Sequence, residues 1–330
     1  MQLSVLERLS AAGKSPVDTA RLGDTLSLTP VQLQEAIDGL VAHGCIIKKE
    51  SHQVVRLYRT GISTWKDYLE NRLGDRYRVQ VYAQTGSTQD VAARLAMEMS
   101  SGDLGLVIAG NQTQGRGRLN RKWYSKENQS LTFSWVMMEP DFKEIRAERL
   151  TLGAGVALCQ GIEKACSKPS PALQMKWPND IYLGDRKLAG ILIETRRIAE
   201  GKIAWIVGVG VNMETSSYMG IQHQGLAMER NERGFKSVSL KQAGYGASRV
   251  VLCRHIAQSL EKMIDAEAKA ILDAWHQRCD MIGKEMAFSH DGHVYRGMVM
   301  QLCPEQGLIL QTADGSIIHL PSRSTSTHLD

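Results

Sequence analysis

The chain has 330 residues, of which 43% are hydrophobic and 23% are charged, and its formal net charge is +5 at pH 7. This length allows two or three domains, and the mild positive charge permits an acidic or phosphate-bearing partner without requiring one. The six cysteines are scattered and do not cluster with histidine, which argues against a disulfide framework or a zinc site. No apolar run reaches the roughly 18 residues of a membrane span, and no signal-peptide pattern is present. We therefore expect a cytoplasmic protein without a membrane partner.

The first 63 residues carry the pattern of three helices and a hairpin. Apolar residues recur at helical spacing near the N-terminus, and Thr29 and Pro30 supply an N-cap and a first-turn proline for a third helix. The expected helices lie at residues 3–9, 17–25 and 30–42, and the expected strands at residues 45–47 and 54–57. Three helices and a hairpin in this order resemble a winged helix-turn-helix.

Whether this head binds DNA does not follow from its shape. A helix that reads DNA usually offers Arg, Lys, Asn or Gln to bases and phosphates. The third helix offers Gln32 and Gln34, but also Glu35 and Asp38, and no Lys or Arg. The cations lie in the hairpin instead, at Lys48, Lys49, Arg56 and Arg59. Specific operator binding and a retained interaction module that binds DNA weakly or not at all both stay open.

A helix at residues 65–73 and a strand at residues 77–82 should lead to a strand-to-helix turn at Ser87 and Thr88. Hydroxyl side chains in such a turn commonly cap the following helix, which is sufficient reason for their presence. The apolar run at residues 105–109 predicts a buried strand that leads to Gln112.

Residues 115–123 read Gly-Arg-Gly-Arg-Leu-Asn-Arg-Lys-Trp. Four cations in nine residues could not be buried without partners, so this segment is predicted to be a loop. Glycine lets the backbone approach a ligand closely, and arginine presents a rigid fork of donors to phosphate or carboxylate. The segment alone fits a loop that closes over an anionic ligand and a solvated basic turn equally well.

A helix is expected at residues 149–166, where Gly153, Gly155 and Gly161 suggest close packing against the sheet. Then follows Lys-Trp-Pro-Asn-Asp at residues 176–180, a proline corner that can hold the carboxylate of Asp180 still. A well-capped turn would explain this corner equally well.

Two strands should form a hairpin at residues 181–183 and 188–193, and Lys187 opens the second. An isolated lysine there would normally be a solvated edge residue.

A further buried strand is expected at residues 205–211. It ends in Gly208-Val209-Gly210-Val211-Asn212, which lacks the third glycine and the following helix of a dinucleotide fingerprint, so a Rossmann domain is excluded. Residues 214–236 are predicted to be a loop and residues 249–279 a helix. Short strands at residues 286–288, 294–299, 307–310 and 317–320 predict a small β-barrel.

Three segments, GRGRLNRKW (115–123), KWPNDIYL (176–183) and RKLAGIL (186–192), resemble the signatures of biotin protein ligases in order and spacing. The resemblance covers essentially the whole chain and is to the bifunctional form, a biotin operon repressor and ligase. It implies an α+β protein with three domains. These are a winged helix-turn-helix at residues 1–63, a catalytic domain with a class II synthetase-like mixed β-sheet and helices at residues 64–283, and an SH3-like small β-barrel at residues 284–330.

The resemblance also implies the biotin site. Ser87 and Thr88 would face the ureido ring of biotin, while Gln89 stands where the family usually has Asn and receives no ligand role. The implied biotin-binding residues are Ser87, Thr88, Gln112, Gly115, Arg116, Lys187, Gly190, Gly208 and Gly210.

The implied reaction has two steps and uses ATP with Mg²⁺. The biotin carboxylate attacks the α-phosphorus and releases pyrophosphate, and the resulting biotinyl-5′-AMP then reacts with a lysine amine of a carrier domain. Implied catalytic residues are Arg116, Arg118, Lys187 and Asp180, with Asp180 near the amine. Implied adenylate-binding residues are Arg118, Arg121, Trp123, Lys187 and Asn212. The loop at residues 214–236 could cover adenine, although no single residue in it is assigned.

The implied partners are a biotin carboxyl carrier protein, operator DNA and a second copy of the chain. Two alternatives stay open: a lipoate-type ligase, which shares the fold and the adenylation chemistry, and a repressor or binding protein without transfer activity. The tail reads Pro-Ser-Arg-Ser-Thr-Ser at residues 321–326, where the family commonly has Gly-Glu-Val-Ser. The barrel is still expected, but whether this tail contributes to ATP binding or repression stays open.

Overall fold

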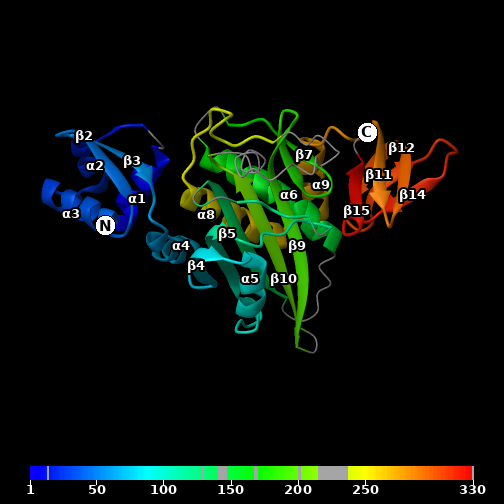
Figure 1. Cartoon of the computed structure of the whole chain (residues 1–330), viewed down its shortest axis with the longest axis horizontal. Helices are drawn as coiled ribbons and strands as arrows, with labels where there is room; N and C mark the ends of the chain where they lie inside the picture. The colour runs from blue at the N-terminus through cyan, green and yellow to red at the C-terminus, as the bar shows by residue number, and fades with distance from the viewer. Residues whose placement is uncertain are drawn as a thin grey trace.

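A computed structural model describes residues 1–12, 15–119, 121–125, 127, 129–139, 147–166, 170–199, 202–214 and 237–328. It contains sheets of three, seven and five strands, which follow one another along the longest axis of the molecule (Figure 1). The expected mixture of helices and sheets is confirmed. None of the described helices is long and apolar enough to cross a membrane.

The N-terminal part consists of three helices around a small sheet. The helices are α1 (Gln2–Ala11), α2 (Thr19–Leu26) and α3 (Pro30–Ala42), and the strands are β1 (Val17–Asp18), β2 (Ile46–Ser51) and β3 (Val54–Arg59). Thr29 caps α3 as predicted, since its hydroxyl accepts from the Gln32 amide and the Gln32 side chain accepts from the Thr29 amide. Strands β2 and β3 form the expected hairpin, and β1 adds to β3.

An ion-pair cluster joins this part to the centre of the molecule. A short turn η1 (Ile62–Thr64) leads into α4 (Trp65–Leu73), the helix predicted at the same residues. Glu7 of α1 accepts hydrogen bonds from Arg72 of α4 and from Arg254, which stacks on the ring of Tyr68. These contacts hold the first helix against two helices of the central part.

The central sheet has the strand order β4-β5-β6-β10-β9-β8-β7. Only β4 and β5 pair in parallel; all other neighbours are antiparallel, so the sheet is mixed as expected. The strands are β4 (Tyr77–Thr85), β5 (Leu104–Gln112), β6 (Ser130–Met138), β7 (Leu173–Lys176), β8 (Asp180–Leu183), β9 (Arg186–Ala199) and β10 (Lys202–Asn212).

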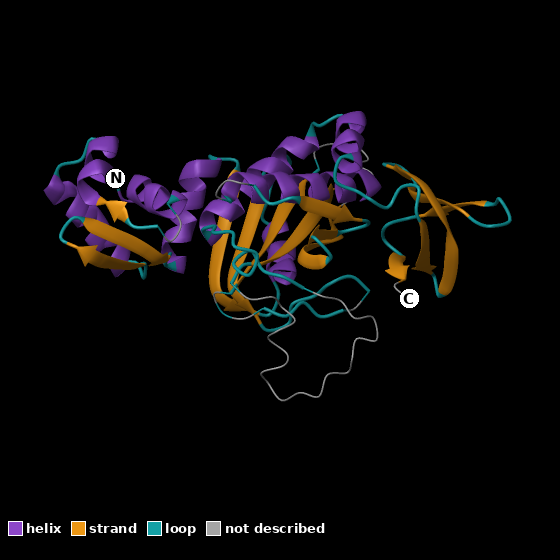
Figure 2. Cartoon of the chain, turned by 90° about the horizontal axis from the view of Figure 1, so that it is seen from above, coloured by secondary structure: helices purple, strands orange, loops and turns teal. Residues whose placement is uncertain are grey.

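Helices cover both faces of this sheet because its central strands are apolar on both sides. Val107, Val136 and Ile206 pack with α5 (Thr88–Ala96) in one cluster. Alternate residues such as Leu106 and Trp135 belong to a second cluster on the other face. That face carries α6 (Ala147–Ala165), α8 (Arg249–Ile264) and α9 (Ala268–His276) (Figure 2).

The prediction of one continuous helix at residues 249–279 is wrong. Helix α8 ends at Ile264, and α9 begins at Ala268 after an extended Glu267. Arg149 of α6 donates a hydrogen bond to the carbonyl of Ala266 between them. No glycine or proline marks this break, so the local pattern did not predict it.

The C-terminal part is an antiparallel sheet with the order β14-β13-β12-β11-β15. Its strands are β11 (Glu285–His290), β12 (His293–Cys303), β13 (Gly307–Gln311), β14 (Ile317–Leu320) and β15 (Thr325–His328). The first four confirm the predicted strands. The fifth was not predicted; it pairs with β11 and places the end of the atypical tail at the edge of this sheet.

Close packing of α6 against α8 depends on Gly161. A Cβ atom there would lie 2.6 Å from Cγ1 and 2.7 Å from Cα of Ile256. At Gly153 of the same helix, the nearest atom would be 3.4 Å away, which is ordinary contact. The close packing expected against the sheet is found at Gly155, where a Cβ atom would lie 3.3 Å from the sulfur of Met175 in β7, whereas Gly161 packs against α8 instead.

We expect Gly161→Ala to lower the free energy of unfolding by about 1–3 kcal/mol, because α8 would have to shift. Gly153→Ala is the matched control and should be neutral or raise stability by up to about 1 kcal/mol through helix propensity. Urea unfolding of the two variants checks this. Equal destabilisation by both substitutions would contradict the packing argument.

Candidate functional site

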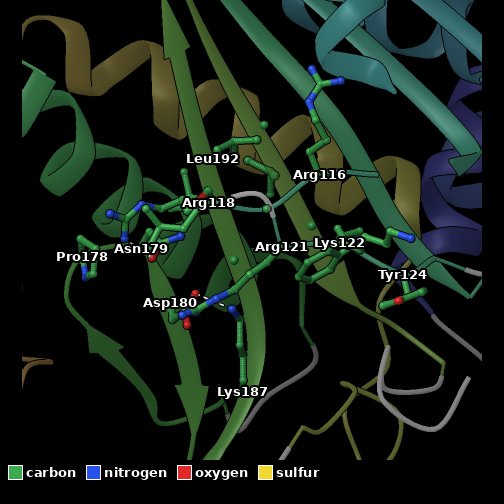
Figure 3. A pocket seen from close by; sticks show the side chains of 18 of the residues that line it. Arg116, Arg118, Arg121, Lys122, Tyr124, Pro178, Asn179, Asp180, Lys187 and Leu192 are labelled. Carbon is green, nitrogen blue, oxygen red and sulfur yellow. Dashed lines mark hydrogen bonds and ion pairs between the residues drawn. The ribbon is translucent and has the colours of Figure 1, made fainter. Parts of the chain in front are cut away.

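A cavity of about 250 Å³ opens on the central sheet beside residues 115–123, which we call the glycine-arginine loop (Figure 3). Its walls come from the start of α5, the loop at residues 116–124, the corner at residues 176–180, strands β8, β9 and β10, and two residues of β15. Segments that are far apart in the sequence thus meet at one place. Most of the residues selected by sequence line this cavity.

The turn at Ser87 and Thr88, which we call the hydroxyl turn, forms one end of the cavity. The Ser87 hydroxyl caps α5 by accepting from the Gln89 amide at 3.3 Å. The Thr88 backbone amide and hydroxyl both donate to the side-chain oxygen of Gln112, at 2.8 and 3.1 Å. Ser134 donates to the Thr88 hydroxyl. The capping role and the pocket role predicted for these residues therefore coexist.

Two glycines of β10 make room for other side chains of the cavity. A Cβ atom at Gly208 would lie 2.8 Å from the side-chain nitrogen Nε2 of Gln89. This nitrogen donates a hydrogen bond to the Leu192 carbonyl. A Cβ atom at Gly210 would lie 2.4 Å from the ring of Trp123. The absence of side chains at these positions lets Gln89 and Trp123 pack directly on the strand.

The glycine-arginine loop is closed by its own backbone. The Trp123 amide donates to the Gly115 carbonyl at 3.0 Å, and the Gly117 amide donates to the Arg121 carbonyl at 2.7 Å. A Cβ atom at Gly115 would lie 2.4 Å from the Trp123 carbonyl, so this position requires glycine. The predicted loop is confirmed in its described residues; Asn120 lies outside them.

Arg116 points away from the other catalytic candidates (Figure 3). Its guanidinium donates to both carboxylate oxygens of Asp90, at 2.8 and 2.9 Å, and lies 3.6 Å from Glu194. These hydrogen bonds lower the pKa of Asp90. The structure thus does not bring the Arg116 guanidinium together with Lys187 and Asp180, but uses it to fasten the loop to α5.

Arg118 is half-buried between the loop, the proline corner and the tail. It donates to the side chain of Asn179 at 3.2 Å, to the Thr325 carbonyl at 2.8 Å and to the Ser322 carbonyl. Burial lowers its pKa to about 10, so the guanidinium stays charged at neutral pH. The tail therefore reaches the site, which the sequence did not indicate.

Further tail contacts complete this wall. The Ser322 amide donates to the Glu148 carboxylate at 2.7 Å, and burial raises the pKa of Glu148. The Thr327 hydroxyl donates to the Trp177 carbonyl at 3.3 Å. Ser326 and Thr327 line the cavity themselves.

Lys187 and Asp180 form the ion pair at the centre of the site. Their side chains lie on the neighbouring strands β9 and β8, with Nζ 2.6 Å from Oδ1. A Cβ atom at Gly190 would lie 3.3 Å from the Lys187 ammonium and 3.4 Å from the Asp180 carboxylate. The absence of a side chain at Gly190 thus lets the ion pair lie close against the strand.

The cavity lining is strongly cationic. The lining cations are Arg116, Arg118, Arg121, Lys122, Lys176 and Lys187, and the lining carboxylate in the described part of the chain is Asp180. Figure 3 shows Arg121 reaching toward the Asp180–Lys187 pair. Such a balance suits a ligand with several negative charges.

Asn212 does not line the cavity. Its side-chain amide is buried and donates to the carbonyl of Val238 at 3.1 Å. It therefore fastens the segment after residue 237 to β10. The loop predicted at residues 214–236 lies outside the described residues except for Glu214.

Comparisons with known proteins agree with this fold. Residues 81–212 match the model of the "Biotin/lipoate A/B protein ligase family". Within it, the similarities are to biotin protein ligases, so the resemblance inferred from the three motifs is confirmed.

The chain is 29% identical to a "Bifunctional ligase/repressor BirA" of Bacillus spizizenii over 226 residues, 66% of each chain. It therefore spans just under two thirds of that relative. It is 34% identical over 143 residues to a "Biotin--[acetyl-CoA-carboxylase] ligase" of Paracoccus denitrificans, covering 43% of this chain and 58% of that one. The solved biotin protein ligase of Aquifex aeolicus in complex with biotin and ATP is 25% identical, with a TM-score of 0.57, over 77% of this chain and 99% of that one.

The anchoring of Arg116 by Asp90 can be tested without reference to any reaction. We expect Asp90→Asn to speed amide hydrogen exchange in residues 113–123 roughly fivefold, for a loss of about 1 kcal/mol at this half-exposed ion pair. Asp103→Asn, which breaks the comparable pair with Arg78 far from the loop, is the control. Unchanged exchange in the Asp90 variant would show that the pair does not hold the loop.

Proposed function

We propose that this protein is an ATP-dependent biotin ligase that forms biotinyl-5′-AMP and transfers biotin to a lysine of a carrier domain. The observation that supports this most is the division of one cavity into two chemical halves. Hydrogen-bonding groups in apolar surroundings lie at one end, and cations gather around the Lys187–Asp180 pair at the other.

The first half suits the uncharged ring system of biotin. A neutral bicyclic urea needs a few placed donors and acceptors in an otherwise apolar pocket. Ser87, Thr88 and Gln112 supply the polar groups, while Trp123 and Phe133 supply apolar walls. Gly208 and Gly210 let Gln89 and Trp123 pack on β10 and so form this part of the wall.

The second half suits the adenylation step, in which two anions must meet. Catalysis here needs positioning and charge neutralisation rather than a covalent intermediate with the protein. Lys187 can share its charge between the biotin carboxylate and the α-phosphate, and Arg118 and Arg121 can neutralise the phosphates. Arg116 supports the step indirectly by holding the loop through Asp90.

Mg²⁺ would enter this site mainly with the nucleotide. In the described residues, no group of three or more His, Cys, Asp or Glu side chains could hold a metal ion, and Asp180 is the lining carboxylate. Mg²⁺ commonly uses one or two carboxylates together with substrate phosphates, which is compatible with this lining. When bound, it would neutralise phosphate charge.

The second step needs a carboxylate near the incoming amine and protection from water. Asp180 can orient the acceptor ammonium group or accept its proton. The closed loop, with Arg118 fastened to the proline corner and the tail, would keep water from the mixed anhydride. The acceptor would be a biotin carboxyl carrier protein or domain.

We also propose the finer domain assignment. Residues 1–63 would be a winged helix-turn-helix that binds operator DNA, residues 64–283 the catalytic domain, and residues 284–330 an SH3-like barrel. Three helices followed by a paired hairpin support the first assignment, and five short antiparallel strands support the last. Two copies of the chain would bind two operator half-sites as a homodimer.

The enzymatic proposal is tested by ATP–pyrophosphate exchange with purified protein, run with biotin and separately with lipoate. We expect exchange that depends on biotin, and we expect Lys187→Ala to reduce it about 100-fold, by analogy with loss of a single group that stabilises transition-state charge. Lys202→Ala, an exposed lysine at the far end of β10, is the control. Exchange with lipoate alone would assign a lipoate-type ligase, and exchange with neither would leave a binding protein or repressor.

DNA binding has a separate test, since α3 lacks cations. Lys48 lies 5.1 Å from the ring centre of exposed Tyr58, and Lys49 donates to Gln34 of α3, so the hairpin carries the accessible positive charge. If operator selection from random duplexes succeeds, we expect Lys48→Ala to reduce the salt dependence of binding by about one phosphate contact. Failure to enrich any sequence would favour the interaction module.

A further inference from the structure

Lys176 is a cation of the cavity to which no role has yet been assigned. It ends β7 and lies directly opposite Asp180 in the β7–β8 pair, so both side chains are on the same face of the sheet. Its ammonium group lies 5.4 Å from the ring centre of Tyr182, which also lines the cavity. Lys176 is therefore fixed to the sheet, whereas Arg121 and Lys122 are exposed on the loop.

The Lys176 ammonium has no hydrogen-bond acceptor and no ion-paired carboxylate among the described residues, although the charges of Asp180 and Asp280 act to raise its pKa. The other inner cations have them: Lys187 contacts Asp180, and Arg118 contacts two backbone carbonyls. Lys176 is half-buried, and this burial lowers its pKa. A half-buried ammonium group without an acceptor is costly, and an anion in the cavity would remove that cost.

The position of Lys176 in the sheet indicates which part of a ligand it would meet. The groups that line the cavity follow the strand order: Gln112 on β5, Gly210 on β10, Lys187 on β9, Asp180 on β8 and Lys176 on β7. Neighbouring strands are about 4.8 Å apart. Lys176 therefore lies at the end of the row that is farthest from the hydroxyl turn and Gln112.

Adenylation imposes the same linear order on its reactants. A carboxylate oxygen bonds to the α-phosphorus while the bond from that phosphorus to the bridging oxygen breaks, and pyrophosphate leaves with the electron pair. The attacking and leaving oxygens lie roughly in line. With the biotin ring at Gln112 and its carboxylate at Lys187, the leaving group lies beyond β9, toward β7.

We propose that Lys176 binds the β- and γ-phosphates of ATP and stabilises pyrophosphate as it leaves. This inference rests on the proposed ligase function and adds a residue to its first step only. Lys176 would take no part in holding biotin or in the transfer of biotin from the adenylate. This restriction to the leaving phosphates distinguishes Lys176 from Lys187, which would contact both the biotin carboxylate and the α-phosphate.

The test uses the full-length protein and the variants Lys176→Met and Lys176→Arg, with Lys262→Met on the exposed face of α8 as control. We expect Lys176→Met to raise the KM for pyrophosphate and for ATP in biotin-dependent exchange about tenfold, which corresponds to about 1.4 kcal/mol. Biotin affinity and single-turnover transfer from synthetic biotinyl-5′-AMP to a carrier domain should stay within twofold of the parent. Lys176→Arg should restore most of the pyrophosphate affinity.

An active parent whose pyrophosphate KM is unchanged by Lys176→Met would overturn the inference and leave the ligase function intact. Equal losses in biotin binding and in transfer would also overturn it, because they would indicate a structural role. If Lys176→Met does not fold, Lys176→Gln, which keeps a polar side chain of similar reach, takes its place. A parent without biotin-dependent exchange would refute the proposed function, and this inference with it.

Discussion

The crowding of positive charge in one cavity is the constraint on which the rest of the site depends. Six cations line the cavity, and like charges at this spacing repel one another. The fold compensates three of them with groups from different elements: Asp90 of α5 for Arg116, Asp180 of β8 for Lys187, and tail carbonyls for Arg118. Each compensating contact also holds an element against the cavity. The contacts that balance the charge of the site therefore also determine its architecture.

Compensation differs between these cations, and the difference separates their roles. Arg116 has its charge matched by carboxylates that lie outside the cavity, so it acts on the loop. Lys187 is matched by Asp180 inside the cavity, and both side chains line the cavity, where a bound anion can share the lysine charge. Arg118 is held by neutral carbonyls, which satisfy its hydrogen bonds but leave its positive charge for a ligand. A static charge count would have treated all three alike.

Local sequence patterns predicted the parts of the molecule whose reasons are local. Apolar runs predicted β5 and β10, Thr29 and Pro30 predicted the start of α3, and the density of cations predicted the loop at residues 115–123. The features that were missed depend on contacts distant in sequence. The break between α8 and α9 is held by Arg149, the outward direction of Arg116 is set by Asp90 and Glu194, and β15 exists because it pairs with β11. In each case the partner lies too far along the chain to belong to the same local sequence pattern.

The tail shows why an unusual sequence can still complete the site. Arg118 contacts the backbone carbonyls of Ser322 and Thr325, and Glu148 accepts from the backbone amide of Ser322. Backbone groups are present whatever the side chains are, so these contacts require a chain path rather than a particular sequence. The path is set by the pairing of β15 with β11 and by the burial of Thr325. A departure from the family pattern at residues 321–326 therefore does not remove the tail from the cavity, because what the cavity uses is the position of the backbone.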